Sequence, residues 1–217
     1  MVMIGRMEER DVVRAGEVIV AAFNDVFARH GFPPPFPSTE TGIGLARGYL
    51  QLEPQECFVA EEGGKVVGSG FLHLRGATAG IGPITVDPAF QSKGVGKELM
   101  MTVIRTGRNC PSLRLVQDTF NTVSFPLYSK LGFTACGTIA SLGSQELRPA
   151  TRPRGVAIRE ATAEDTARIA ALDTKLTGIA RTQDIHYFLH QSPQLMSFID
   201  GKLSGHLCML RMGESVF

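Results

Sequence analysis

The hydrophobic pattern of the first quarter of the chain predicts two helices. Apolar side chains recur three or four positions apart, the spacing of one helical face, at Val12, Ala15, Ile19, Phe23 and Val26. The helix is expected to take Asp11 as its N-cap and to end near Arg29 or His30, because Gly31 and three consecutive prolines follow. A weaker helix is expected from residue 39 or residue 41 to residue 52, where three glycines interrupt the pattern.

Short runs rich in β-branched and aromatic residues, bounded by turn residues, are typical of strands. Such runs predict strands over residues 3–7, 57–61, 65–75, 77–86, 113–117 and 133–140. A Glu-Gly-Gly turn at residues 62–64 marks a hairpin. A further helix is expected from about residue 121 to 131, or from Ser124 if Pro126 is to fall in its first turn. This order of elements predicts a mixed α/β layered domain over residues 1–140.

One more helix follows the strand that ends near residue 86. Asp87 and Pro88 stop that strand, because proline has no N–H to continue a ladder. Apolar residues then recur at Val95, Leu99 and Val103, so one face of the helix is expected to be buried. The helix should begin near residue 92 or 93.

The start of this helix has the features of an anion-binding turn. The first N–H groups of a helix lack internal partners and carry partial positive charge. Gly94 and Gly96 have no Cβ to keep a ligand's oxygens away from the backbone, and Lys93 and Lys97 add charge. The turn therefore predicts a phosphate site; the alternative is a glycine-rich turn that binds nothing.

Two other glycine motifs do not fit. A Walker P-loop would need glycine at position 91 and serine or threonine at position 98, where the chain has glutamine and glutamate. A dinucleotide fingerprint beginning at Gly80-x-Gly82 would need its third glycine where Thr85 stands.

Two motifs resemble those of the GNAT superfamily of acyl-CoA-dependent N-acyltransferases. Q-x-x-G-x-G at residues 91–96, after a strand and opening a helix, is similar to its pyrophosphate loop, and the order of elements is also the GNAT order. N-x-x-S-x-x-L-Y-x-x-L-G-F at residues 121–133 is similar to its second signature. Asn121, Ser124 and Tyr128 fall on one helical face. The resemblance implies a GNAT-like α/β fold, with a mixed, mostly antiparallel central sheet flanked by helices.

The resemblance also implies acetyl-CoA as co-substrate, bound in a V-shaped gap between the strands at 77–86 and 113–117. A primary amine would attack the thioester directly in a ternary complex, and Tyr128 would protonate the leaving thiolate as general acid. Without the motif, Tyr128 could equally be a buried core tyrosine. The cofactor-binding residues implied are Ile84, Thr85, Val86, Gln91, Ser92, Lys93, Gly94, Val95, Gly96, Lys97, Asn121 and Ser124.

A general base is not identified. The splayed strand carries no glutamate, and His73, Glu40 and His30, which could act through water, are each interpreted as surface or structural residues. The acceptor is expected to be a small-molecule or peptide amine. The proline-rich loop at residues 31–41, with Phe32 and Phe36 as an apolar wall, is expected to select it, with the C-terminal part of the chain as a further contributor. The missing glutamate leaves a catalytically silent acyl-CoA-binding or sensing module as the alternative function, and a scaffold that binds nothing as a third.

The last third of the chain predicts a partial repeat of the first domain. Residues 141–155 are polar, broken by prolines and typical of a linker. Beyond them, residues 158–165 parallel residues 4–11, and residues 201–205 parallel residues 64–68. Residues 156–217 thus resemble the N-terminal half of a second GNAT copy without the pyrophosphate loop; a truncated gene is the other interpretation. Its last strand, about 202–212, would have an open edge that pairs with the first domain or with a second subunit, giving a possible homodimer.

Composition excludes several classes of partner. The net charge is +1 and the basic residues are scattered, so neither nucleic acid nor an anionic membrane is expected to bind. The four cysteines lie far apart without CxxC spacing, so we expect reduced thiols and no metal site. The sequence shows no apolar segment long enough to span a bilayer and no pattern of a leader peptide. The chain is therefore expected to be soluble and cytoplasmic.

Overall fold

The computed structural model describes residues 2–140, 151, 153–209, 211–212 and 215–216. Its first part is a five-stranded sheet with the strand order β1-β2-β3-β4-β5. The first three pairings are antiparallel and the β4–β5 pairing is parallel. The strands are β1 Met3–Arg6, β2 Cys57–Glu62, β3 Lys65–Arg75, β4 Thr78–Val86 and β5 Ser112–Leu115. The predicted mixed, mostly antiparallel sheet is confirmed.

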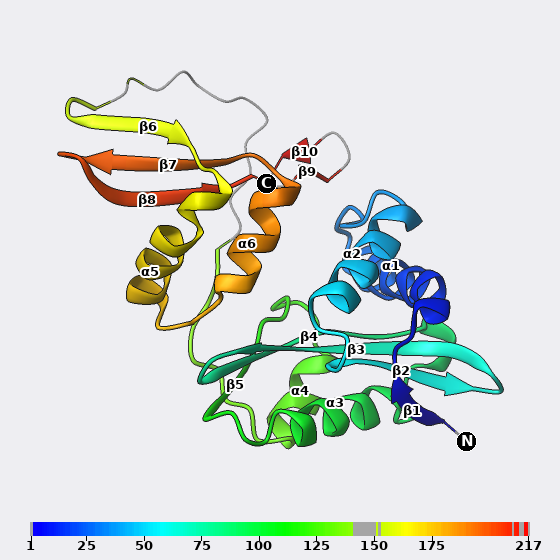
Figure 1. The fold of residues 1–217 in the computed structure, drawn as a ribbon. Coiled ribbons are helices and arrows are strands. Elements are labelled where there is room, and N and C mark those ends of the chain that lie inside the picture. The colour runs from blue at the N-terminus through cyan, green and yellow to red at the C-terminus, as the bar shows by residue number, and fades with distance from the viewer. Residues whose placement is uncertain (1, 141–150, 152, 210, 213–214, 217) are drawn as a thin grey trace.

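Helices cover both faces of this sheet, two on each (Figure 1). They are α1 Val12–Arg29 and α2 Thr39–Leu52 on one face, and α3 Val95–Thr106 and α4 Ser124–Lys130 on the other. Val95, Leu99 and Val103 are buried against the sheet, as their spacing predicts. Pro126 falls in the first turn of α4, where its missing N–H costs nothing.

Glycines make the contact between α1 and α2. A Cβ on Gly16 would lie 2.5 Å from the Cα atom of Ile43, and one on Gly42 would lie 2.5 Å from Cγ2 of Val20 and would also overlap the carbonyl oxygen of Gly16. Because no side chain fits there, the two backbones touch directly. The glycines that weaken the predicted second helix are therefore partly a packing feature, whereas Gly44 faces open space.

Three details of the expected elements were wrong. Helix α3 begins at Val95, not at residue 92 or 93, because Ser92 and Gly94 have φ angles of 63° and 86°, which a right-handed helix excludes. Asp11 does not cap α1 with its side chain; its Oδ2 accepts the N–H of Glu8 at 2.8 Å, within the 3₁₀ turn Glu9–Asp11.

The third difference is the stretch 133–140, which forms no strand. A strand is stable only with a partner, and the adjacent edge strand β5 has four residues. Most of the side chains in 133–140 are exposed, so little burial would stabilise an added strand.

The C-terminal part of the chain forms a separate three-stranded antiparallel sheet, packed on two helices (Figure 1). Its elements are β6 Val156–Glu160, the 3₁₀ turn Ala163–Asp165, α5 Thr166–Thr177, α6 Thr182–Gln191, β7 Gln194–Ile199 and β8 Lys202–Cys208, followed by the two-residue strands β9 Arg211–Met212 and β10 Ser215–Val216. Most of the expected linker lies outside the described residues. Within them, β8 pairs with β7 alone, so the expected pairing of this edge with the first domain is not formed.

Two kinds of feature are absent from the described residues. No helix there is both long and apolar enough to cross a membrane, and no three His, Cys, Asp or Glu side chains gather in a metal-binding arrangement.

Candidate active site

A gap opens where β4 and β5 separate. The two strands pair from Thr78 with Ser112 to Ile81 with Leu115. There β5 ends, while β4 continues to Val86. The cavity between them has a volume of about 270 Å³. The residues that line it are Phe23, Ile81, Gly82, Pro83, Ile84, Leu115, Val116, Gln117, Asp118, Asn121, Ser124 and Tyr128.

Four residues expected at the site meet in this lining: Ile84, Asn121, Ser124 and Tyr128. Thr85 is not among them, because its side chain is buried on the other face of the sheet, where its hydroxyl bonds to that of Ser69 at 2.7 Å. Sequence reasoning also missed Gln117 and Asp118. Their position just before the asparagine of the second motif was the available signal.

The main chain of β4 directs alternate N–H groups into the gap. The N–H of Asp87 donates to the carbonyl oxygen of Val67 on β3 at 2.9 Å. Since successive N–H groups of a strand point to opposite sides, those of Ile84 and Val86 face away from β3, on the side of the gap. The N–H of Thr85 faces β3.

The turn between β4 and α3 leaves a row of backbone donors free. In the described part of the chain, no protein acceptor lies within hydrogen-bond distance of the N–H groups of residues 92–97. The N–H of Gln91 reaches the carbonyl oxygen of Pro88 at 3.5 Å, and that of Glu98 donates to Gly94 at 3.1 Å as the first helical bond. Six consecutive free donors at a helix N-terminus form a site for an anion.

Gly94 and Gly96, the two glycines of this turn, meet different structural requirements. Gly94 has a φ angle of 86°, which favours glycine. Gly96 has no such constraint, and a Cβ there would lie 3.6 Å from Cγ2 of Val86 and 4.0 Å from Cδ2 of Leu127, ordinary contact distances. The protein itself would accept alanine at position 96, so the space beside Gly96 is open to a ligand.

Arginines of α1 brace the start of the turn. Arg14 forms an ion pair with Asp87, whose Oδ1 also accepts the N–H of Ala89 at 3.0 Å. Arg29 donates to Oε1 of Gln91 at 3.1 Å, while the Nε2 of Gln91 donates to the carbonyl oxygen of Val86 at 3.2 Å. Gln91 was expected to bind the cofactor, but both ends of its amide are held by protein. Its side chain therefore braces the turn.

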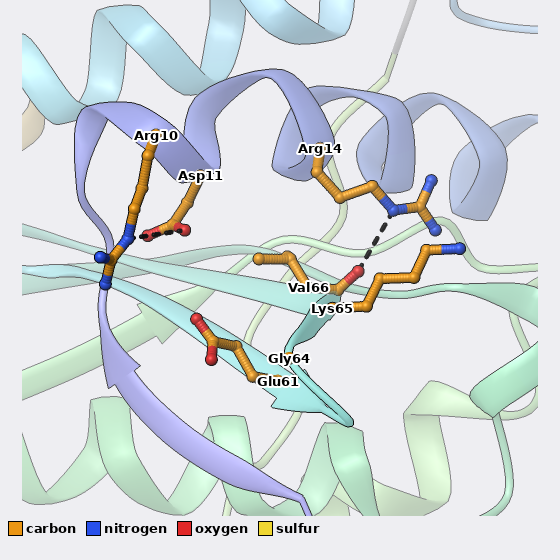
Figure 2. A pocket seen from close by; sticks show the side chains of 7 residues that line it. All are labelled: Arg10, Asp11, Arg14, Glu61, Gly64, Lys65 and Val66. Atoms are coloured by element: carbon orange, nitrogen blue, oxygen red, sulfur yellow. Dashed lines mark hydrogen bonds and ion pairs between the residues drawn. The ribbon is translucent and has the colours of Figure 1, made fainter.

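Arg14 also borders a second and larger hollow, of about 540 Å³, at the β2–β3 turn. Figure 2 shows its walls, which carry charges of both signs. Arg14 donates hydrogen bonds to the carbonyl oxygen of Val66, at 3.2 Å, and to the carboxylates of Glu17 and Asp87. The hollow shares no residue with the gap that Tyr128 lines.

Tyr128 lies on α4 and is one of the residues that line the gap. Burial raises the pKa of Tyr128, and a hydrogen bond with Ser124 opposes part of that shift. Ser124 is itself held by Gln117, whose Oε1 accepts its hydroxyl at 2.8 Å, and by Asn121, whose Oδ1 accepts its N–H at 3.2 Å. The tyrosine is therefore uncharged at neutral pH and can donate its proton. The polar contacts of Ser124 fix the first turn of its helix.

The sequence of this chain is similar to those of known proteins. The profile described as "Acetyltransferase (GNAT) family" matches residues 23–133, from the middle of α1 to the end of the second motif. The chain belongs to the acetyltransferase (GNAT) family.

Individual proteins resemble this chain in sequence or, at 20% identity and below, in fold alone. Glucosamine 6-phosphate N-acetyltransferase from Trypanosoma brucei brucei is 33% identical over 85 residues, which are 36% of this chain and 57% of that protein. A putative acetyltransferase from Pyrococcus horikoshii has 20% identity and a TM-score of 0.68, over 89% of this chain and 64% of its own. PaiA N-acetyltransferase from Thermoplasma acidophilum, solved with coenzyme A, has 18% identity and a TM-score of 0.54. That match covers 65% of this chain and 94% of the PaiA chain. This chain thus spans less than two thirds of the first two proteins.

None of the side chains considered as a base lines the gap of the GNAT domain. His73 bonds through both ring nitrogens, to Glu53 at 2.8 Å and to the carbonyl oxygen of Gly82 at 2.7 Å. His30 bonds to the carbonyl oxygen of Val26, and Glu40 is exposed, with its pKa lowered by a hydrogen bond from Ser38. The carboxylate that does line the gap is Asp118.

Aromatic side chains of α1 and of the proline-rich loop gather beside the gap. Phe36 packs on Phe23, with ring centroids 5.4 Å apart, and Phe23 lines the gap. Phe32 stacks on Phe120 at 4.6 Å, and Phe27 meets the same ring edge-on at 5.0 Å. Both phenylalanines expected to form an apolar wall thus belong to aromatic contacts with α1 and with the loop before α4.

Proposed function

We propose that this GNAT protein transfers the acetyl group of acetyl-CoA to a primary amine by direct attack in a ternary complex. The observation that carries the proposal is the row of free N–H groups at residues 92–97. This row adjoins the end of β4, and β4 borders the gap that Tyr128 lines. Gly96 connects the two, because its nearest side chains are those of Val86 on β4 and Leu127 on α4. A diphosphate on the turn would leave the attached arm running into the gap.

Each group has a separate role in the proposed reaction. The amides of residues 92–97 would bind the diphosphate, and the main chain of Ile84 and Val86 would hold the pantetheine arm and polarise the thioester carbonyl. Asn121 has its amide N–H groups left to donate, because its Oδ1 already accepts from Ser124. As the amine nitrogen bonds to the carbonyl carbon and the C–S bond breaks, Tyr128 donates its proton to the thiolate.

Asp118 is our candidate for the proton acceptor, because it is the carboxylate among the lining residues. Replacing it in an Asp118→Asn variant is expected to lower kcat roughly tenfold at neutral pH, less than for a directly positioned base because a water would relay the proton. The loss should shrink as the pH approaches the pKa of the acceptor amine. Glu40→Gln, at an exposed carboxylate outside the gap, is the control, and equal pH–rate profiles for the two variants would exclude Asp118.

The test of the proposed function is release of free thiol from acetyl-CoA in the presence of a panel of amines. We expect continuous turnover with at least one amine, together with a rise in melting temperature when acetyl-CoA alone is added. The absence of a glutamate on β4 favours the second candidate, a silent acyl-CoA-binding module. That module would show the rise in melting temperature and no thiol release with any amine. A scaffold would show neither.

We also infer a tandem organisation: a GNAT domain at residues 1–140, a linker at 141–155 and a partial copy at 156–217. In both parts a strand, a 3₁₀ turn, two helices and a hairpin follow in the same order. The third residue of each 3₁₀ turn is an aspartate, Asp11 or Asp165, whose Oδ2 accepts the N–H three residues earlier, at 2.8 and 3.0 Å. Superposition of residues 156–208 on residues 3–75 tests this, and a different helix crossing would contradict it.

A further inference from the structure

A cluster of polar side chains, two of them buried, joins the C-terminal part of the chain to the GNAT domain. It is built from the end of α2, from β3 and from the start of α6. Its members are Glu53, His73, Arg75, Gln183 and Asp184. Glu53 and Arg75 are only 6% and 7% exposed, so each of these charges depends on its partners in the cluster.

Every charge in the cluster has an opposite charge beside it. Arg75 donates from Nε to Oδ2 of Asp184 at 2.5 Å and from Nη2 to Oδ1, a two-pronged contact across the boundary. Glu53 accepts from Arg75, from Nδ1 of His73 at 2.8 Å and from Nε2 of Gln183 at 2.8 Å. Burial raises the pKa of Glu53, but the hydrogen bonds from His73 and Arg75 outweigh it, so the pKa is lowered and the carboxylate stays ionised.

The cluster reaches the wall of the gap through His73. Its Nε2 lies 2.7 Å from the carbonyl oxygen of Gly82, which lines the gap two residues before Ile84. Both contacts hold the ring, because a carboxylate and a carbonyl oxygen are each strong hydrogen-bond acceptors. Tyr49 packs on the ring, with centroids 4.6 Å apart. The orientation of this histidine is therefore set by Glu53, by Gly82 and by an aromatic neighbour.

We infer that the C-terminal part is a positioning element of the acetyl-transfer site. Asp184 orients Arg75, and Arg75 and Gln183 together orient Glu53. Glu53 in turn orients His73. The ring of His73 fixes the carbonyl group of Gly82, and with it the part of β4 that leads to Ile84. The inference rests on the proposed function of the gap. Among the described residues, no hydrogen bond joins the free amides of residues 92–97 to a member of the cluster. We therefore expect binding of coenzyme A to be independent of the cluster and alignment of the thioester to depend on it.

Asp184→Asn is the test, with Asp173→Asn as its matched control. Asp173 also makes a two-pronged contact with an arginine, Arg181, at 2.7 and 2.8 Å, but entirely within the C-terminal part. We expect Asp184→Asn to lower kcat about tenfold, as small misplacements at a reacting centre do, with KM for acetyl-CoA unchanged. Asp173→Asn should leave both constants unchanged, and Asp184→Glu should recover part of kcat. Equal kcat for the Asn variants and the parent protein would overturn the inference.

A second readout separates this inference from the proposed function. In backbone NMR spectra, Asp184→Asn should shift the amide signals of Gly82 and Ile84, and Asp173→Asn should not; unmoved signals would overturn the inference even without a known acceptor. Failure of the unmodified protein to release thiol with any amine would overturn the transferase proposal instead. If the Asp184→Asn variant does not fold, Gln183→Leu replaces it, because that change removes only the contact with Glu53. We expect kcat to fall to about a third of the parent value, with KM for acetyl-CoA unchanged. An unchanged kcat would overturn the inference.

Discussion

Replacing Tyr128 with phenylalanine is expected to lower kcat for acetyl transfer by about 10²- to 10³-fold, the range for loss of a positioned general acid. Affinity for acetyl-CoA should stay the same, because the diphosphate turn and the β4 main chain are untouched and the ring keeps its edge contact with Phe133, at 6.4 Å. Thiol release measures kcat, and calorimetry with coenzyme A measures affinity.

Tyr187→Phe is the matched control, since that tyrosine lies on α6 and does not line the gap. The pH dependence is a further check. Burial raises the pKa of Tyr128 above the ordinary 10.0, and the donor form exists below the pKa, so no alkaline loss from this residue is expected up to about pH 10. A phenylalanine variant as fast as the parent would mean that water protonates the thiolate.

Gly96→Ala is expected to weaken coenzyme A binding roughly 100-fold while slightly raising the melting temperature. The added methyl would lie between the phosphate oxygens and the N–H groups, and losing one or two charge-assisted hydrogen bonds, each about 1.5–3 kcal/mol, corresponds to that loss. Without ligand the methyl meets Val86 and Leu127 at ordinary distances, and alanine is the better helix former by up to about 1 kcal/mol. Calorimetry and thermal unfolding measure the two opposite effects.

Gly44→Ala provides the comparison, because Gly44 lies in the interior of α2 with nothing within 4 Å of an added Cβ. It should give a similar gain in melting temperature with unchanged coenzyme A affinity. If Gly96→Ala also binds coenzyme A like the parent protein, the free amides of the turn do not hold the diphosphate, and the proposed cofactor site is wrong.

Local patterns in the sequence predicted most of the elements, and the resemblance of the second motif predicted three of the five polar residues that line the cavity. Asn121, Ser124 and Tyr128 are separated by three and four positions, so helical geometry alone places them together. Helix α2 was also predicted despite its glycines. By contrast, the contribution of Thr85 depended on which side of β4 faces the gap, and the strand predicted at 133–140 lacks a partner. Both depend on pairing between distant segments, which spacing does not encode.

Contacts across long sequence separations account for the remaining differences. Asp184 and Arg75 are 109 residues apart, and nothing in either neighbourhood marks them as partners. The amide of Gln91 fits the cofactor motif, yet Arg29, 62 residues away, holds it. Asp118 enters the site because β5 stops at Leu115 and the loop after it turns into the gap, and a strand's end is the least predictable feature of a pattern.

The bare contact of Gly16 with Gly42 has a consequence for how this protein could be altered. Two helices joined backbone to backbone hold their crossing without help from the loop between them, and Asn24 anchors that loop at one further point, through both backbone groups of Phe36. We therefore expect that the segment from residue 31 to residue 35 can be exchanged for another sequence without disturbing the sheet, if an aromatic residue is kept at position 32 to stack on Phe120. Because this loop is predicted to select the acceptor, we propose it as the place to graft a different acceptor specificity, provided that both glycines are kept.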